Sequence, residues 1–187
     1  MTNVYFIRHA KSDFSIEDES IRPLTKKGFK DSEKLLKLFK DISIDNFYSS
    51  PYVRSIDTIK PLAKQRDKEI IVREDLRERN IGMWVNDFFK FSKKQWDNFD
   101  YKIDNGESLL ETQRRNVSEI NKILNKHKNG NIVIGTHGTA LCTIINYFQP
   151  EIGYDYFLSI VDKMPFVIKM VFEGNEFKSF DTTRDYI

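Results

Sequence analysis

Two of the three histidines in this sequence, His9 and His137, closely follow apolar runs and stand beside an alanine or a glycine. Arg8 precedes His9, and Arg54 follows a third apolar segment. A neutral imidazole is a competent nucleophile near pH 7, and arginines close to it help to keep it unprotonated. Guanidinium groups match the oxygens of a phosphate group. These residue types indicate phosphoryl transfer, although their spacing alone is equally compatible with structural histidines.

Phosphoryl transfer also needs an acid that protonates the leaving oxygen, and Glu78 is a candidate. It lies within the densely charged run Arg73–Arg79. Such runs are usually solvated, so the sequence by itself favours a surface position for this carboxylate. For His127, near the end of an expected helix, we predict a surface position and an interaction with the helix dipole. Cys142 lies in an apolar helical segment and is expected to fill space in the core.

The apolar patterns predict strands that alternate with helices. Strands are expected over 3–7, 47–48, 69–72 and 131–135, helices over 25–39, 53–66 (disturbed at Pro61), 108–129 and 139–148, and a hairpin over 166–180. The segment 12–23 lacks periodicity and is expected to be a loop. This alternation predicts an α/β fold, a three-layer α/β/α sandwich around a mainly parallel sheet. Ligands of such sheets bind beyond the carboxyl ends of the strands, where the histidines and arginines fall.

Composition limits the classes of protein to which the chain can belong. Its 187 residues suit one domain over 1–187, and 40% hydrophobic with 31% charged residues is an ordinary globular balance. A net charge of +2 gives no basis for general binding to nucleic acid or to a membrane surface. One cysteine permits neither an internal disulfide nor a cysteine-rich metal site. With no signal peptide or apolar run of membrane-spanning length, we expect a cytoplasmic protein without a bound metal. Its oligomeric state stays open.

The segment 83–105 interleaves aromatic residues with lysines. One interpretation is a lid whose aromatic walls exclude water and select the organic part of a substrate. The other is a pair of short helices packed on the core, with solvated lysines between them. We expect packing to account for most of these aromatic residues. A few lysines without a wider basic surface argue against binding of single-stranded nucleic acid.

Five segments between residues 4 and 138 resemble, in order, the motifs of the histidine phosphatase superfamily, which includes the phosphoglycerate mutases. They are YFIRHAKS (5–12), RPLTKKG (22–28), SSPYVRSIDT (49–58), LRERNIG (76–82) and GTHG (135–138), and Gly106-Glu107-Ser108 with Arg115 matches a further pattern. Each motif alone is weak, but five in the family's order are a strong signal. The resemblance implies a phosphoglycerate mutase-like fold and an enzyme without a cofactor.

Carried over residue by residue, the resemblance implies roles for the residues at the strand ends. His9 would attack phosphorus and form a phosphohistidine. Arg8, Arg54 and His137 would bind the phosphoryl oxygens and spread the developing charge, with Gly138 beside them. The expected substrate is a small phosphorylated metabolite.

The resemblance also implies roles outside the strand ends. Glu78 would protonate the leaving alkoxide and then deprotonate the hydrolytic water, and Arg79 would reach a phosphate or carboxylate of the substrate. Ser15 stands where mutase-type members often carry a substrate-binding asparagine. Ala10 and Lys11 stand where the family more commonly has a glycine and an acidic residue. With these two residues, the segment RHAKS resembles the corresponding motif of small phosphatases that act on phosphohistidine proteins.

Phosphomonoester hydrolysis is therefore the leading hypothesis for this chain. A phosphoglycerate mutase and a phosphohistidine-protein phosphatase are the alternatives within enzymes. A module that binds phosphate without turnover is the alternative outside them, since a fold does not guarantee activity.

Overall fold

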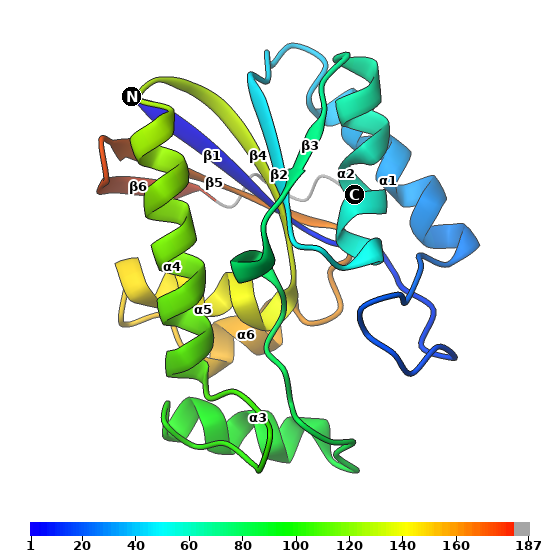
Figure 1. Ribbon diagram of the computed structural model, residues 1–187, viewed down its shortest axis with the longest axis vertical. Coiled ribbons are helices and arrows are strands. Elements are labelled where there is room, and N and C mark those ends of the chain that lie inside the picture. Colours follow the sequence, from blue (N-terminus) through cyan, green and yellow to red (C-terminus); the bar gives the residue numbers. More distant parts are fainter. Residues whose placement is uncertain (182–187) are drawn as a thin grey trace.

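The computed structural model describes residues 1–181, which form a six-stranded sheet and six α-helices (Figure 1). The strands are β1 (Thr2–Arg8), β2 (Asn46–Ser49), β3 (Ile70–Val72), β4 (Gly130–Thr136), β5 (Phe166–Glu173) and β6 (Glu176–Asp181). The helices are α1 (Lys26–Leu38), α2 (Val53–Gln65), α3 (Phe88–Asp97), α4 (Leu109–Lys126), α5 (Gly138–Phe148) and α6 (Tyr154–Ile160), with a 3₁₀ turn, η1, at Glu74–Leu76.

The sheet has the strand order β3-β2-β4-β1-β5-β6. The four strands from β3 to β1 are parallel, whereas β5 and β6 form an antiparallel hairpin at the edge next to β1. The register places Arg8 opposite Thr136, and Ser49 opposite Gly135. The segments that follow β1, β2 and β4 therefore meet at one edge of the sheet. The predicted mainly parallel sheet is confirmed.

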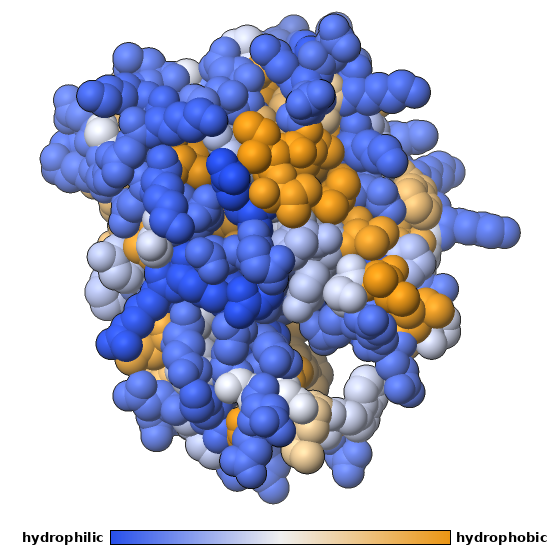
Figure 2. Space-filling model, in the orientation of Figure 1, coloured by the Kyte–Doolittle hydropathy of each residue, from blue (hydrophilic) through white to orange (hydrophobic). Residues whose placement is uncertain are grey.

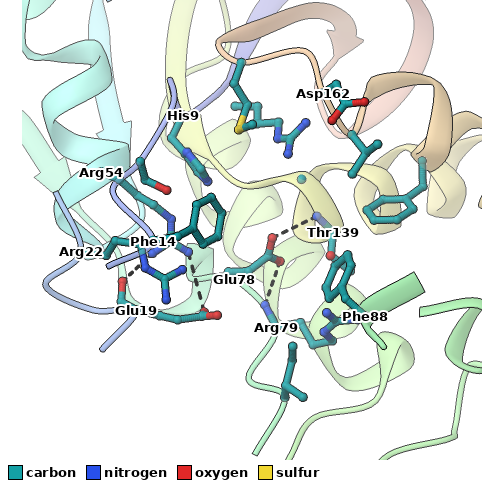
Figure 3. A pocket seen from close by; sticks show the side chains of 17 residues that line it. His9, Phe14, Glu19, Arg22, Arg54, Glu78, Arg79, Phe88, Thr139 and Asp162 are labelled. Atoms are coloured by element: carbon teal, nitrogen blue, oxygen red, sulfur yellow. Dashed lines mark hydrogen bonds and ion pairs between the residues drawn. The ribbon is translucent and has the colours of Figure 1, made fainter. Parts of the chain in front are cut away.

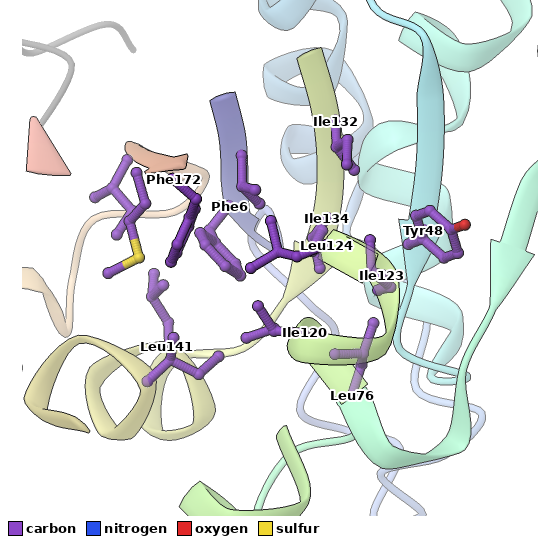
Figure 4. Packing of buried hydrophobic residues seen from close by; sticks show 14 of the residues in the cluster. Phe6, Tyr48, Leu76, Ile120, Ile123, Leu124, Ile132, Ile134, Leu141 and Phe172 are labelled. Atoms are coloured by element: carbon purple, nitrogen blue, oxygen red, sulfur yellow. The ribbon is translucent and has the colours of Figure 1, made fainter. Parts of the chain in front are cut away.

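Helices cover both faces of the sheet, as Figure 1 shows. Along β1, Val4 and Phe6 belong to a core that includes residues of α4 and α5. Tyr5 and Ile7, on the opposite face, belong to a second core with residues of α1 and α2. Figure 4 shows the first core, in which Leu141 of α5 packs with Phe6 and the apolar side of α4. This alternation is typical of a strand buried on both faces, and it confirms the predicted three-layer sandwich.

Two helical predictions were wrong in detail. The helix α2 continues through Pro61 without a break, because Ile59 and Leu62 on either side are fully buried and their packing outweighs the lost hydrogen bond. The segment 83–105 contains one helix, α3, and not two. Its first turn is fixed by Asp87, whose side chain accepts a hydrogen bond from Lys90 N, and the chain returns from residue 98 without a further helix.

His127 is half-buried, so its predicted surface position is confirmed only in part. It stands at the C-cap of α4, near the helix end as expected. Its ring, however, pairs with Tyr48 Oη at 2.8 Å and with Asn46 Nδ2 at 3.3 Å. This histidine therefore joins α4 to β2.

The segment 22–28 fastens the chain that follows His9. Thr25 is the N-cap of α1, and its side chain accepts a hydrogen bond from Gly28 N. Its backbone N–H and its hydroxyl both donate to Lys11 O, at 2.9 and 3.1 Å. Gly28 leaves room for this contact, because a Cβ atom there would lie 2.2 Å from the same carbonyl oxygen.

The helix α2 fastens the same loop from the other side. Thr58 Oγ1 accepts a hydrogen bond from Ala10 N at 2.9 Å and donates to Arg54 O at 2.7 Å. The residue after His9 is thereby tied to the helical turn that carries Arg54. Thr58 and Ala10 are fully buried, so water cannot replace this bond.

We predict that Thr58→Val lowers the free energy of unfolding by about 1–3 kcal/mol, because it leaves the buried Ala10 N–H without an acceptor. Urea denaturation would measure this change. The matched control is Thr112→Val in α4, where the buried hydroxyl donates only to Ser108 O within its own helix. An equal loss in both variants would contradict the fastening role of Thr58.

Candidate active site

A pocket of about 330 Å³ lies where the segments after β1 and β4 and the start of α2 meet. This volume is typical of a site for a small molecule. Its charged walls are formed by Arg8, Arg22, Arg54, Arg79, Glu19, Glu78 and Asp162. Figure 3 shows this pocket and labels all of these residues except Arg8.

The His9 imidazole lines this pocket and has a defined tautomer. Its Nδ1 lies 2.8 Å from Ala10 O. A carbonyl oxygen only accepts hydrogen bonds, so Nδ1 carries the proton and Nε2 keeps its lone pair. Burial, reinforced by the charge of Arg54, holds the pKa of His9 well below its usual value. The ring is therefore neutral at pH 7, with a free lone pair on Nε2.

His137 is fully buried directly behind His9. The two ring centroids are 5.4 Å apart, and the His137 ring also packs against Tyr52. Its Nε2 lies 2.7 Å from Ser50 Oγ, and its Nδ1 has no hydrogen-bond partner in the described part of the chain. Burial and the charge of Arg54 lower the pKa of His137 as well. If the Ser50 hydroxyl donates to Nε2, a proton on Nδ1 is left for another acceptor.

Arg8 enters the pocket from the end of β1. Its Nη1 donates to Ile160 O and to Lys163 O at the end of α6, and its Nε has no partner among residues 1–181. A Cβ atom on Gly138 would lie 3.1–3.3 Å from three atoms of this guanidinium. The glycine in the predicted site therefore makes room for Arg8.

Arg54 lies in the first turn of α2 and is almost completely buried. Its Nη1 donates to Glu19 O, its Nη2 lies 3.7 Å from Glu19 Oε2, and its guanidinium stands over the Tyr52 ring. Glu19 thus holds the loop 12–23 against Arg54. Burial raises the pKa of Glu19, and the charge of Arg54 opposes this shift.

Glu78 is half-buried in the pocket wall and caps the start of α5. Its Oε2 accepts a hydrogen bond from Thr139 N at 3.0 Å, and its Oε1 accepts from Ala140 N and from Arg79 N, both at 2.8 Å (Figure 3). The N-terminus of a helix stabilises a carboxylate in this way. The predicted acid is therefore not a solvated member of the charged run.

Arg115 holds the backbone around Glu78. Its guanidinium donates to Asp75 O, Arg77 O and Glu78 O at 2.7–2.9 Å, and to both carboxylate oxygens of Glu107 at 2.8 Å. Two parallel bonds of this kind fix orientation as well as position. The pattern around Glu107 and Arg115 thus positions the segment of Glu78.

The two remaining predicted site residues differ in their positions. Arg79 is buried and lines the pocket, where Gln95 Oε1 accepts a hydrogen bond from its Nη1. Ser15 is exposed, does not line the pocket, and donates from its hydroxyl to Asp13. The structure therefore brings together all the predicted site residues except Ser15, with His137 behind the wall.

Several residues that line the pocket, including the polar Ser12, Glu19, Arg22, Thr139 and Asp162, were missed by the sequence analysis as site residues. The Ser12 hydroxyl is buried without a partner in the described residues, and Glu19 faces Arg54. Arg22 donates to Ile16 O and to Glu17 O and so shapes the loop that carries Glu19. Ser12 is the last residue of the motif YFIRHAKS, and Arg22 is the first residue of RPLTKKG, so the motifs could have indicated both. No sequence pattern around Glu19 marks it as a site residue.

A second hollow of about 450 Å³ adjoins the pocket and shares Phe14, Glu19, Arg22, Ile81 and Phe88 with it. Residues 80–86 form most of its other wall, including the exposed Trp84. Figure 2 shows the surface hollowed at the lower right, near the loop 12–23 and this segment. The predicted aromatic insertion thus contributes one wall beside the site and packs its buried side, through Trp96, against Phe157 of α6.

Residues 1–181 contain neither a metal-binding cluster nor a membrane-spanning helix. Across these residues, no three or more His, Cys, Asp and Glu side chains gather where they could hold a metal ion. No helix there has both the length and the apolar character needed to cross a membrane. Cys142 is fully buried in α5, as expected, and burial raises the pKa of its thiol.

The sequence profile of the histidine phosphatase superfamily (branch 1) matches residues 4–178, so the chain belongs to this superfamily. The proteins that are similar to this chain include mutases and phosphatases. The chain is 25% identical over 159 residues to a probable phosphoglycerate mutase GpmB of Escherichia fergusonii, covering 78% of this chain and 74% of that protein. It is 26% identical over 161 residues to a putative phosphoserine phosphatase 2 of Hydrogenobacter thermophilus, covering 78% and 77%.

Solved structures share the fold. YhfR of Bacillus stearothermophilus superposes with a TM-score of 0.78 at 24% identity, covering 95% of each chain. A phosphoserine phosphatase of Entamoeba histolytica, solved in complex with 3-phosphoglyceric acid, has a TM-score of 0.78 at 21% identity and covers 100% of each chain. The predicted phosphoglycerate mutase-like fold is confirmed.

We predict that stability falls as the pH is lowered below about 6.5, the usual pKa of histidine. His9 and His137 have lowered pKa values in the folded chain, so the unfolded chain binds protons first and is favoured by up to about 1.4 kcal/mol per pH unit for each. Urea denaturation between pH 7 and 5 would measure this slope. His9→Asn should make it shallower, and a slope that does not change would contradict the lowered pKa of His9. His127→Asn is the control with a less buried ring.

Proposed function

We propose that this protein is a phosphatase that hydrolyses phosphomonoesters of small metabolites through a phosphohistidine intermediate on His9. The observation that carries the proposal is the state of His9 in the pocket. Its Nδ1 is committed to Ala10 O, its pKa is lowered by burial, and arginines form the walls around it. A neutral Nε2 in a positive pocket is what attack on a phosphate ester requires.

In the first step, His9 Nε2 attacks phosphorus and the ester P–O bond breaks. Arg8 and Arg54 bind the equatorial oxygens. His137 lies behind the pocket wall, and its Nδ1 would donate to a phosphoryl oxygen only after a shift of that wall. In the second step a water attacks the phosphohistidine, the P–N bond breaks, and inorganic phosphate leaves. In both steps a phosphoryl group passes from one nucleophile to another. The protein therefore contributes mainly by positioning the reacting groups and by stabilising the developing charge.

Glu78 serves as the acid and base of this cycle. It gives a proton to the leaving alkoxide and later takes one from the attacking water. A protonated Oε2 would donate to the leaving oxygen and give up its hydrogen bond from Thr139 N, while Oε1 keeps its two N–H donors. Arg115 keeps the segment in place during this exchange.

The segment 83–105 acts as a cover for the leaving group. The hollow beside the pocket, with Trp84 and Phe14 on its walls, supports this part of the proposal because an organic group could extend into it. We also propose that the chain is a single domain in which the segment 83–105 is a lid-like insertion.

A mutase is the second candidate, favoured by the similarity to the probable phosphoglycerate mutase of Escherichia fergusonii. The two activities share the phosphohistidine and differ in the second acceptor. A mutase returns the phosphoryl group to a hydroxyl of the substrate, whereas a phosphatase gives it to water.

We predict that the natural protein releases inorganic phosphate from a panel of phosphomonoesters and that His9→Ala does not. A loss of about 10⁴-fold or more is expected for removal of a covalent nucleophile. The assay measures free phosphate, and circular dichroism checks that the variant folds. Transfer of phosphate between positions of a phosphoglycerate without release would favour the mutase. Full release by His9→Ala would contradict the proposal.

We predict that Glu78→Gln slows hydrolysis by about 10²-fold or more for alkyl esters, whose leaving oxygen needs a proton, and much less for p-nitrophenyl phosphate. The measurement is kcat/KM for both classes of ester. The substitution also loses one N–H acceptor at α5, so its urea stability is measured in parallel. Equal slowing for both classes would argue against the acid role and leave only the cap.

A further inference from the structure

Glu19 carries the one carboxylate of the pocket wall that forms an ion pair with an arginine of that wall within residues 1–181. Its Oε2 lies 3.7 Å from Arg54 Nη2, and its main-chain oxygen accepts a hydrogen bond from Arg54 Nη1 (Figure 3). Burial lowers the pKa of Arg54, and the Glu19 carboxylate is the largest of the charges that oppose this shift. Arg54 binds the phosphoryl group in the proposed reaction, so Glu19 contacts a group that the substrate also needs.

The main chain of Glu19 is held in place, whereas its carboxylate is held weakly. Arg54 binds the carbonyl of Glu19, and Val53 N donates to Ser20 O at 3.1 Å, so the start of α2 fixes two successive residues of the loop 12–23. The carboxylate accepts no hydrogen bond from residues 1–181, because its contact with Arg54 is longer than a hydrogen bond, and the side chain is 39% exposed. The side chain can therefore rotate while the loop keeps its position.

The structure provides space for this rotation. Glu19 lines both the pocket and the adjoining hollow of about 450 Å³, and the hollow is lined by neither His9 nor Arg54. A carboxylate that turns into the hollow therefore leaves the residues that bind phosphate. The charges of Arg54, Arg22 and Arg79 attract the carboxylate, whereas that of Glu78 repels it. An anion bound at Arg54 would add to the repulsion.

We propose that the Glu19 carboxylate competes with phosphate for Arg54. It pairs with Arg54 when the pocket is empty, gives way when a phosphoryl group binds, and returns as inorganic phosphate leaves. The inference rests on the proposed function and adds a control of product release to it. Without this competitor, a phosphate dianion would be held by guanidinium groups whose other partners are mainly neutral oxygen atoms. Such charge-assisted bonds are strong in a partly buried site, and they would slow the release of the product.

The test measures the binding of inorganic phosphate by calorimetry in the natural protein and in Glu19→Gln. Glutamine has the same length and keeps the main-chain carbonyl that binds Arg54, so the substitution removes the charge alone. The Kd for phosphate is expected to fall about tenfold, because the anion no longer displaces a carboxylate. If Glu19 served only to hold the loop 12–23, the substitution would leave the affinity unchanged or weaken it.

Two further variants separate competition from a general effect of charge. Glu17→Gln is the matched control, because Glu17 belongs to the same loop and lines the hollow but is exposed and does not line the pocket. This control should bind phosphate with nearly the natural affinity, since solvent screens an exposed charge. In an Arg54→Met background, Glu19→Gln should improve the affinity much less than in the natural protein, because the competition requires Arg54.

An unchanged, raised or unmeasurably high Kd in Glu19→Gln would overturn the proposal. An equal gain of affinity with and without Arg54 would also overturn it, because Glu19 would then act by general repulsion. In the turnover assay, inhibition by inorganic phosphate should become stronger in Glu19→Gln by the same factor as binding. Because calorimetry needs no turnover, a lower Kd that depends on Arg54 would support the inference even if the natural protein released no phosphate. Lack of release by itself would count only against the proposed phosphatase.

Discussion

Four arginines line the pocket, and neutral oxygen atoms hold most of their guanidinium groups. Arg8 and Arg22 donate to main-chain carbonyls, and Arg79 donates to an amide side chain. Arg54 donates to the carbonyl of Glu19, whose carboxylate stays 3.7 Å away. Neutral acceptors fix a guanidinium without cancelling its charge. The pocket therefore keeps a positive potential that adds to burial in lowering the pKa of His9 and of His137, and that would attract a phosphate group in the proposed function.

This concentration of charge explains the shape of the loops around the site. Burying unpaired guanidinium groups is costly unless their N–H groups find acceptors. The loop 12–23 turns its carbonyls toward Arg22, and the end of α6 turns two carbonyls toward Arg8. Each loop is thus held by an arginine that it helps to position. Thr25 and Thr58 hold the backbone that follows His9. Thr25 donates to Lys11 O, and Thr58 accepts a hydrogen bond from Ala10 N.

Local patterns in the sequence were sufficient for the layers of the fold and for the residues at the strand ends. Strand alternation places Arg8, Arg54 and His137 at one edge once the sheet is parallel, and the motif order then identifies His9. Contacts between distant segments were not predictable in this way. The half-buried place of His127 depends on Tyr48, 79 residues away, and Gln95 meets Arg79 only after α3 has folded back. Ser15 lies outside the pocket, where its hydroxyl donates to Asp13 Oδ1.

The start of α5 connects the acid to the phosphate site. A free helix N-terminus would itself attract a phosphate group. Here the N–H groups of Thr139 and Ala140 are occupied by Glu78, so in the proposed reaction the binding of phosphate would be left to other groups, above all the arginines. A proton that passes from Glu78 to a leaving oxygen returns the carboxylate to the form that these N–H groups bind best. In the proposed cycle the helix cap therefore favours the transfer from Glu78 to the leaving oxygen and opposes the later transfer from water to Glu78.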